Sequence, residues 1–468
     1  MSFQVPSISL VAKIITLKAP CNPLDGQPRH IILDTKMITM RASPPRPQLS
    51  VAIVGAGLSG LCLAQALHKA GFTVNVYERD PAPDTRRQGY RLTLDRYGAA
   101  ALQACLPPRL FAAVLATASA PADIAYFRVT NQSLGEIFRL TFRRDASPPD
   151  GLTIGQVDRA TLRAIMLSGL KDRVHFGKAV ERAEATANGA ILCLAEGGAE
   201  RVSMVVGADG AHSAIRGRLL PDVRVIDSGF RGIYGRTPLR TVDGESVVPK
   251  SLSDSGVLAI GDAPGRSFFF TSMRFNEPPE TVFARLVPDQ RPPVSADYVM
   301  RAVMLPKEEL PADLWNLAPE ALHGIALAAA RDYHPVLQRF VHDAEVEYTV
   351  ATALSSATRP TDWPASHVTL MGDAVHVMPP TGAHGGNTAL RDAALLADRL
   401  QAGRRDGASM REAIGEYQRE MIAYAFREVE NSVAMLRRNN VTNPVARFAM
   451  LRVVPWARSL VRQSPAVG

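Results

Sequence analysis

The sequence predicts an α/β fold in which a parallel sheet with flanking helices carries an inserted β-rich domain and is followed by C-terminal helices. Two observations predict it. Short apolar runs typical of buried parallel strands occur at 51–54, 202–206 and 368–371, and each leads into a turn rich in Gly or Asp before a helix. Between the last two runs, short β-like segments alternate with Pro and Gly, and after residue 388 the pattern is helical.

The composition indicates an ordinary globular protein with a core large enough for two or three domains. The chain has 468 residues, and 46% of them are hydrophobic, whereas a typical domain has about 150 residues. The net charge of +8 comes from arginines spread along the chain, without the run of like charges that a nucleic-acid-binding arm shows. We therefore expect no nucleic-acid partner. The basic balance suits an anionic small molecule, and a solvated surface explains it equally well.

The cysteine spacing and the hydropathy both bear on location. The cysteines are Cys21, Cys62, Cys105 and Cys193. Because they form no C-x-x-C pair, a zinc site, a thioredoxin-like motif and a disulfide framework are not expected, and neither is any other metal site. No apolar run approaches the ~18 residues that span a bilayer, and the run at 8–17 is interrupted by Lys13 and lacks a cleavage site. The sequence predicts a soluble, cytoplasmic protein.

A G-x-G-x-x-G turn stands between a predicted strand and a predicted helix. The strand at 51–54 precedes it, a helical pattern at 58–70 follows it, and a second strand at 73–77 completes a βαβ unit. In such a unit the first glycine permits the tight bend, the second lets a pyrophosphate approach the backbone, and the third lets the helix lie close to the strand. The residues predicted to bind a dinucleotide here are Gly55, Ala56, Gly57, Leu58, Ser59 and Gly60.

Glu78 ends the second strand, 18 residues after Gly60. A carboxylate at this place binds both ribose hydroxyls of an adenosine and repels the additional phosphate of NADP. The sequence therefore predicts FAD or NAD at this turn, with Glu78 and the adjacent Arg79 in the site. The alternative interpretation is that Glu78 is a solvated charge after a strand.

Three further segments carry the pattern beyond a simple NAD-binding unit. They are Val-Gly-Ala-Asp-Gly at 206–210, Gly-Asp-Ala-Val-His at 372–376 and Pro-Pro-Thr-Gly-Ala-His-Gly-Gly-Asn at 379–387. Together with the first glycine turn, they resemble the flavin motifs of the class A flavoprotein monooxygenases, the para-hydroxybenzoate hydroxylase family. The resemblance covers residues 49–410 and implies a Rossmann-like FAD-binding domain.

The resemblance implies resident FAD and assigns individual residues to it. Asp373 is expected to hydrogen-bond the ribityl chain, and Asp209 and Gly210 to belong to a turn with both structural and nucleotide-binding roles. Arg91 and Arg159 are similar to the family's two cofactor-side arginines, although a plain surface arginine is the alternative for each. The other residues expected in the cofactor site are Gly372, Pro379, Gly382, Gly385, Gly386 and Asn387.

With these motifs, the sequence divides into three domains and an N-terminal segment. Residues 1–48 show no sustained period and end in a Pro-rich stretch, so we expect a poorly ordered extension. The other predicted units are a discontinuous FAD-binding domain of residues 49–221 and 356–410, a substrate-binding β-sheet domain of residues 222–355, and a C-terminal helical segment of residues 411–468.

The resemblance also implies a reaction. Transiently bound NADPH or NADH reduces FAD, O2 adds at C4a, and the flavin C4a-hydroperoxide hydroxylates an aromatic, phenolic or polycyclic small molecule of secondary metabolism. Independently of the resemblance, amides at Gly385, Gly386 and Asn387, immediately before a helix, are expected to stabilise negative charge on reduced flavin. No catalytic side chain is assigned. His384 is a candidate acid–base group, and a structural histidine is its more frequent interpretation.

Two other functions stay open on the sequence. One is an FAD-dependent reductase or dehydrogenase of the same fold that inserts no oxygen, and the other is a non-catalytic flavin-binding protein. A flavin-dependent halogenase is excluded, because none of the three tryptophans begins the W-x-W-x-I-P signature of that class.

The β-rich region and the C-terminal tail carry weaker signals. The possible pocket residues are Tyr234, Arg236, Phe268, Phe269, Phe270 and Arg274. Core strand packing is the simpler interpretation of the phenylalanines. The basic amphipathic tail at 444–463 is consistent with a membrane surface, but Pro455 interrupts it, and packing on the protein itself is more common. Both a monomer and a homodimer are compatible with the sequence.

Overall fold

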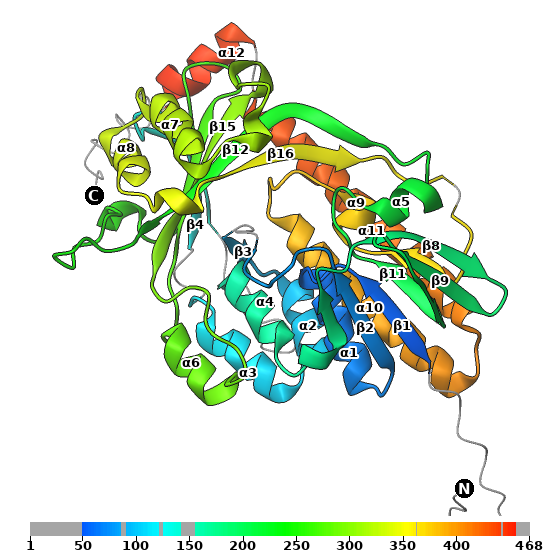
Figure 1. Ribbon diagram of the computed structural model, residues 1–468. Helices are drawn as coiled ribbons and strands as arrows, with labels where there is room; N and C mark the ends of the chain where they lie inside the picture. The colour runs from blue at the N-terminus through cyan, green and yellow to red at the C-terminus, as the bar shows by residue number, and fades with distance from the viewer. Residues whose placement is uncertain are drawn as a thin grey trace, which may run out of the picture. The chain divides into compact units, whose positions relative to one another are not determined.

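The computed structural model describes residues 49–85, 90–120, 125–141, 155–361, 363–440 and 443–454. The described residues belong to one compact unit. The predicted N-terminal extension lies outside the described residues. Within this unit, two main sheets organise the chain (Figure 1).

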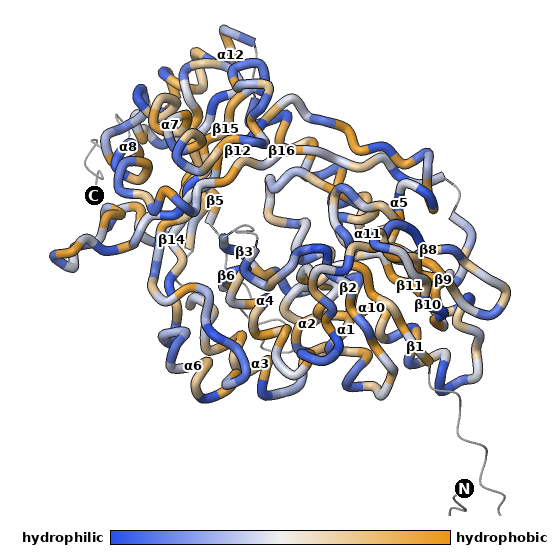
Figure 2. Tube along the Cα trace, in the orientation of Figure 1, coloured by the Kyte–Doolittle hydropathy of each residue, from blue (hydrophilic) through white to orange (hydrophobic). Residues whose placement is uncertain are grey.

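The first is a five-stranded parallel sheet in the order β17-β11-β1-β2-β7. Its strands are β1 (Ser50–Val54), β2 (Thr73–Glu78), β7 (Val174–Phe176), β11 (Met204–Gly207) and β17 (Val368–Leu370). The predicted Rossmann-like sheet is confirmed. Because both faces of a parallel sheet are covered, its strands are nearly continuous runs of buried apolar residues, and Figure 2 shows this pattern.

Helices cover this sheet and share one large apolar core with it. The main ones are α1 (Leu58–Lys69), α2 (Arg96–Cys105), α4 (Arg159–Leu167), α10 (His384–Asp406) and α11 (Met410–Asn439). Ten consecutive residues of α1 are buried, which explains why its pattern is apolar on all sides. The helix α11 begins the predicted C-terminal helical segment of residues 411–468, whereas α10 begins four residues before the predicted 388.

The second sheet has seven strands in the order β16-β12-β15-β14-β13-β4-β5, antiparallel except for the parallel pair β13 and β4. Its strands are β4 (Tyr126–Asn131), β5 (Glu136–Thr141), β12 (Val225–Pro238), β13 (Ser255–Ile260), β14 (Ser267–Met273), β15 (Tyr298–Pro306) and β16 (Val350–Ala357). The predicted inserted β-sheet is present. It also takes in β4 and β5, which precede the insertion in the chain.

Strand alternation gives the seven-stranded sheet two different faces. Phe268 and Phe270 are fully buried in the core beneath the helices α7 (Pro319–Ala330) and α8 (Pro335–His342). This confirms the core interpretation of these two phenylalanines. Phe269 points to the opposite face and packs in a cluster rich in tyrosine.

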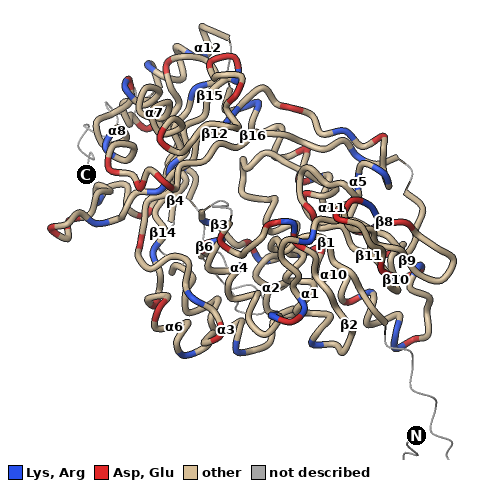
Figure 3. Tube along the Cα trace, in the orientation of Figure 1, with Lys and Arg blue, Asp and Glu red and all other residues tan. Residues whose placement is uncertain are grey.

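Smaller elements complete the described chain. A two-stranded sheet pairs β3 (Arg91–Thr93) with β6 (Gln156–Asp158), and a three-stranded sheet contains β8 (Val180–Thr186), β9 (Gly189–Leu194) and β10 (Ala199–Val202). The other helices are α3 (Pro108–Thr117), α5 (Ala214–Leu219), α6 (Pro279–Leu286), α9 (Asp373–His376) and α12 (Pro444–Phe448). Figure 3 shows Lys and Arg interspersed with Asp and Glu along much of the described chain.

The described part of the C-terminal tail packs on the protein. In α12, the Arg447 guanidinium donates hydrogen bonds to the carbonyls of Gly261, Asp262 and Ala263, and Leu451 is buried against β4 and β13. Residues 455–463 of the predicted amphipathic segment lie outside the described residues. Within the described chain, no helix is both long and apolar enough to cross a bilayer.

The tight packing of α1 on β1 leads to a first prediction. A Cβ at Gly60 would overlap the carbonyl oxygen of Gly55, so we expect Gly60→Ala to lower the free energy of unfolding by about 1–3 kcal/mol. Urea denaturation followed by circular dichroism measures it. Gly217→Ala in α5 is the control, since a Cβ there meets no heavy atom within 4 Å. Equal stability of the two variants would contradict the close packing.

Candidate cofactor site

The glycine turn is built into the carboxyl edge of the parallel sheet. Gly55 has a φ of +107° and donates its amide to the carbonyl of Tyr77 at 2.8 Å. A Cβ at Gly55 would lie 2.8 Å from the carbonyl carbon of Ala208, at the end of β11. Only glycine fits this conformation and this spacing. The turn is therefore fixed between the ends of β2 and β11, and α1 starts directly from it.

Glu78 is buried and is held by the same turn. Its Oε2 accepts a hydrogen bond from the amide of Ala56 at 2.8 Å, and its Oε1 accepts one from the amide of Asp80 at 3.0 Å. A carboxylate has about four acceptor positions, so lone pairs remain for ribose hydroxyls. The two amides preorganise the carboxylate. Arg79, next to it, is exposed.

Arg163 also binds the turn, although no role was predicted for it from the sequence. From α4, its Nε donates to the carbonyl of Ala56 at 2.8 Å, and its Nη1 donates to the carbonyl of Pro83. Arg163 lies one helical turn after Arg159, on the same face of α4. That i, i+4 spacing is the signal that could have identified it.

The second motif lies beside the first. Asp209 Oδ2 accepts the amide of Ala214 at 2.8 Å, at the start of α5. Its Oδ1 is buried and has no hydrogen-bond partner among the described residues, and burial raises the pKa of this carboxyl above its usual value. Gly210 follows with a φ of +79°. The unpartnered oxygen is an acceptor available to a bound molecule.

The third motif meets the glycine turn through Gly372. This residue has a φ of +60°, and a Cβ on it would lie 3.0 Å from the Ser59 hydroxyl on α1. Asp373 is the first residue of α9 and is exposed. Within the described chain its carboxylate forms no hydrogen bond or ion pair. The side chain expected at the ribityl chain is thus available for binding.

The loop before α10 differs in detail from the expectation. The helix begins at His384, so Gly385, Gly386 and Asn387 lie inside its first turn rather than before it. The helix begins there because Ala383, the residue immediately before His384, adopts the left-handed conformation with a φ of +59° and caps the helix. The amides of a first helical turn have no acceptor within the helix. The predicted donors at Gly385 and Gly386 therefore remain.

The other loop residues predicted in the site are Pro379, which is buried, and Gly382, which has a φ of +85°. Asn387 uses its side chain as a clamp. Its Oδ1 accepts the amide of Asp95 at 3.0 Å, and its Nδ2 donates to the carbonyl of Thr93 at 2.8 Å. This joins α10 to the segment between β3 and α2.

Arg91 projects from β3 toward the aromatic face of the seven-stranded sheet. Its Nη1 donates to the Thr93 hydroxyl at 2.6 Å, its guanidinium lies 5.5 Å from the ring centre of Phe269, and its Nε is buried without a partner. Burial lowers the pKa of Arg91 to about 10, and the nearby Tyr298 and Tyr234 oppose this shift. Arg91 therefore stays charged at neutral pH with one donor free.

The contacts of Arg159 and His384 do not assign either side chain to the cofactor site. Arg159 donates its amide to the carbonyl of Tyr90 at 2.6 Å, and its half-buried guanidinium has no hydrogen bond within the described chain. His384 Nδ1 lies 3.3 Å from a carboxylate oxygen of Glu428 on α11. This ion pair gives His384 a structural partner, and its acid–base role stays a prediction.

Tyrosines, together with the buried Asp158, lie at the face of the seven-stranded sheet that carries Phe269. Tyr298 donates its hydroxyl to Asp158 Oδ2 at 2.7 Å, and Asp158 Oδ1 caps α4 by accepting the amide of Thr161 at 2.7 Å. Burial raises the pKa of Asp158, and it raises the pKa of Tyr234 to about 12. Both tyrosines are protonated at neutral pH. The buried Tyr298 hydroxyl is engaged by Asp158, whereas Tyr234 offers an aromatic ring with a hydroxyl group.

The four segments fit a dinucleotide. The buried atoms without partners at Arg91 and Asp209 require a ligand or water. A Cβ at Gly57 would meet no heavy atom within 4 Å, so the backbone there is open to approach. The first turn of α1 offers amides and positive dipole to a pyrophosphate. Glu78 and Asp373 supply acceptors for hydroxyl groups.

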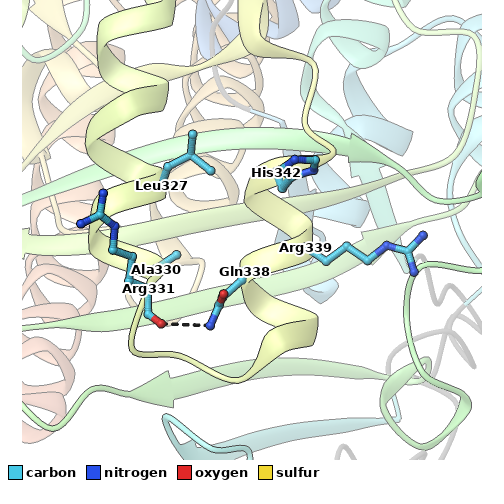
Figure 4. Close-up of a pocket in the computed structure, with 6 residues that line it drawn as sticks. All are labelled: Leu327, Ala330, Arg331, Gln338, Arg339 and His342. Carbon is cyan, nitrogen blue, oxygen red and sulfur yellow. Dashed lines mark hydrogen bonds between the residues drawn. The ribbon is translucent and has the colours of Figure 1, made fainter.

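A hollow elsewhere in the molecule lacks this chemistry. It has a volume of about 420 Å³ and lies between α7 and α8, as Figure 4 shows. Its lining residues are Leu327, Ala330, Arg331, Gln338, Arg339 and His342. No residue predicted in the cofactor site is among them. Within the described residues, no group of three or more His, Cys, Asp or Glu side chains is arranged to hold a metal ion.

The sequence matches two domain families at the segments described above. Residues 53–114 match the NAD(P)-binding Rossmann-like domain, and residues 330–432 match the FAD binding domain. The first range contains the glycine turn, Glu78 and β3. The second contains Asp373 and the first turn of α10.

Related proteins of known description are flavin-dependent. The chain is 31% identical over 390 residues to the dual O-methyltransferase/FAD-dependent monooxygenase elcB of Phaeosphaeria nodorum. The aligned region covers 77% of this chain and 41% of that protein. The chain thus spans less than half the length of that relative. It is 26% identical to the FAD-dependent monooxygenase thnD of Trichoderma harzianum over 87% of this chain and 98% of that one.

A solved structure agrees with these relatives. A Photorhabdus luminescens protein assigned as an FAD-containing monooxygenase has a TM-score of 0.67 and 27% identity to this chain, covering 84% of this chain and 98% of that one. The likeness therefore extends over both main sheets.

The exposed carboxylate of Asp373 gives a second prediction. Since it has no partner within the described chain, Asp373→Ala is expected to leave the unfolding free energy of the apoprotein within about 0.5 kcal/mol of the wild type. FAD binding is expected to weaken by about tenfold or more, as for a lost charged hydrogen bond. Fluorescence titration with FAD measures the affinity. Asp406→Ala, at the C-terminal end of α10, is the control. An equal FAD affinity in both variants would show that Asp373 does not belong to the site.

Proposed function

We propose that the chain is a class A FAD-dependent monooxygenase, as its similarity to the relatives above supports, and that it uses FAD, NADPH or NADH, and O2 to hydroxylate an aromatic, phenolic or polycyclic small molecule. The observation that carries this proposal is the convergence of four distant segments at one edge of the parallel sheet. Ligands of open α/β sheets bind at this edge, outside the carboxyl ends of the strands.

The contacts between the segments support FAD rather than a smaller nucleotide. Gly55 packs on Ala208 beside Asp209, and Gly372 packs on Ser59. Asn387 then connects α10 to β3. This sequence of contacts provides in turn an acceptor for an adenosine ribose, amides for a pyrophosphate, and a carboxylate for a ribityl chain.

The proposed roles of the chain are to bind, orient and stabilise charge. Bound FAD would supply hydride acceptance and C4a-hydroperoxide chemistry. Glu78 would accept the ribose hydroxyls, and the first turn of α1 would face the pyrophosphate. The amides of Gly385 and Gly386 would stabilise negative charge on the reduced ring system, because donors fixed in advance need no reorganisation.

The aromatic face of the seven-stranded sheet supports an aromatic substrate. Phe269 and Tyr234 belong to one cluster with Tyr298, and Arg91 stacks over Phe269. Aromatic rings favour other rings in offset or edge contacts, and a retained guanidinium charge favours a phenolate or an electron-rich ring. We propose that this face receives the substrate.

The proposals for assembly and cellular location are those that the sequence predicts. We propose a monomer or a homodimer, with the small-molecule substrate and O2 as reaction partners. A cytosolic location is supported by the three described cysteines, which are all free thiols: Cys62, Cys105 and Cys193.

The proposed reaction gives a third prediction. The purified chain with FAD is expected to oxidise NADPH or NADH faster when a suitable phenol or polycyclic aromatic is added, and to place one atom of ¹⁸O2 in the product. Mass spectrometry detects the label. Stimulated oxidation without label would indicate a reductase or dehydrogenase, and absence of any oxidation would indicate a non-catalytic flavin-binding protein.

The aromatic face gives a fourth prediction. Tyr234→Phe removes a hydroxyl that is protonated at neutral pH, so we expect the KM for the aromatic substrate to rise about threefold to tenfold, the effect of one lost hydrogen bond. FAD affinity should not change. Tyr333→Phe is the control, because that tyrosine is buried on the other face of the same sheet. Unchanged KM in both variants would place the substrate elsewhere.

A further inference from the structure

A fully buried carboxylate connects three helices behind the third motif. Asp392 on α10 is 0% exposed and accepts three hydrogen bonds. Its Oδ2 accepts the amide of Gly372 at 2.8 Å and lies 2.6 Å from Nε2 of His376, and its Oδ1 accepts the hydroxyl of Tyr424 at 2.6 Å. The amide at Gly372 belongs to the turn that presents Asp373.

The charges around His376 favour its protonated form. Burial lowers the pKa of the imidazole, but the adjacent carboxylate of Asp392 and the more distant one of Asp373 raise it, and the net direction is upward from the usual value. The imidazole is 0% exposed, and its Nδ1 has no hydrogen-bond partner among the described residues. An imidazolium beside a buried carboxylate neutralises a charge that would otherwise be unfavourable to bury.

Other titratable and charged side chains approach this cluster from the helices packed around it. On α5, Arg216 donates from Nη1 to the carbonyl of Ala374 at 3.0 Å. On α10, Arg391 stacks 3.7 Å from the ring centre of Tyr424, and on α11, buried Tyr417 donates to the carbonyl of Leu370 at 2.9 Å. Burial and Asp392 raise the pKa of Tyr417 and Tyr424 far above neutrality. His376 is thus the member of the cluster whose usual pKa is near neutral.

We propose that the His376–Asp392–Tyr424 cluster holds the Gly372–Asp373 turn in the shape that binds FAD and makes the retention of FAD dependent on pH. The proposal rests on the function proposed above. His376 and Asp392 are positioning residues, because they act on FAD through Gly372 and Asp373.

The length of α9 explains why the turn needs this cluster. The helix has four residues, and a single turn is not stable by itself, because forming the first turn of a helix costs more than it returns. Two side chains from outside fix it: Arg216 binds the carbonyl of Ala374, and Asp392 binds the amide of Gly372 and the ring of His376. Without the contacts from Asp392, Gly372 and the turn that positions Asp373 are no longer held.

The direction of the pH effect follows from the raised pKa of His376. The protonated imidazole stabilises the formed turn, which binds FAD, relative to a turn that has lost its shape and in which His376 has its usual pKa of about 6.5. This stabilisation is complete below that value and is lost as the pH rises through the higher pKa of the formed turn. FAD should therefore dissociate more readily at mildly alkaline than at mildly acidic pH.

The test compares FAD dissociation constants of the full chain, measured by flavin fluorescence between about pH 6 and pH 8.5. In the wild type we expect the dissociation constant to rise by about threefold to tenfold over this range, as for partial loss of a charged hydrogen bond. In His376→Gln the amide nitrogen can replace Nε2 as a donor without titrating. Because the amide carries no charge, this variant should resemble the neutral imidazole, keeping the weaker high-pH affinity of the wild type at every pH and losing most of the pH dependence.

Two further variants complete the design. His376→Ala should bind FAD about tenfold more weakly than the wild type at low pH, and His342→Gln, an exposed histidine on α8, should keep the wild-type profile. If His376→Ala does not fold, His376→Gln decides the question alone. A wild-type pH profile in folded His376→Gln would overturn the inference while leaving the FAD site intact. Absence of FAD binding by the wild type at every pH would overturn the proposed function itself.

Discussion

Close backbone packing at the carboxyl edge of the parallel sheet is the constraint on which the rest of the candidate site depends. The end of β11 can approach β1 because Gly55 has no Cβ, and α1 can approach β1 because Gly60 has none. This approach sets Asp209 beside the first glycine turn and leaves the first amides of α1 directed at whatever binds there. Gly372 continues the same packing on the other side, against Ser59.

Local sequence patterns were sufficient to predict these parts. Each glycine motif follows a short apolar strand and precedes a helix, so its place at the sheet edge follows from the order of elements alone. Four of the five parallel strands and the inserted sheet could be predicted for the same reason, whereas β7 precedes no such motif and was not predicted. The start of α10 could not, because it depends on Ala383 adopting a left-handed conformation that its sequence does not favour.

The contacts that join the motifs depend on tertiary structure, so spacing can indicate which helix face a side chain occupies but not the partner that it contacts. Arg163 reaches the carbonyl of Ala56 across more than a hundred residues, and Asn387 uses its side chain to hold the segment before α2. Strands β4 and β5 join a sheet whose other members come much later in the chain. Asp392 looks like an ordinary polar residue of a helix until α9 and α11 enclose it. In each case the partner is brought close by packing rather than by the local pattern.

The central claim is that separate segments of the chain form one FAD site at the edge of the parallel sheet. A crystal structure of the full chain grown with FAD tests it most directly. The account predicts one FAD per chain, with the adenosine ribose hydroxyls within hydrogen-bond distance of Glu78 and the ribityl chain beside Asp373. An FAD bound elsewhere, or bound at the turn without contact to either carboxylate, would contradict the account.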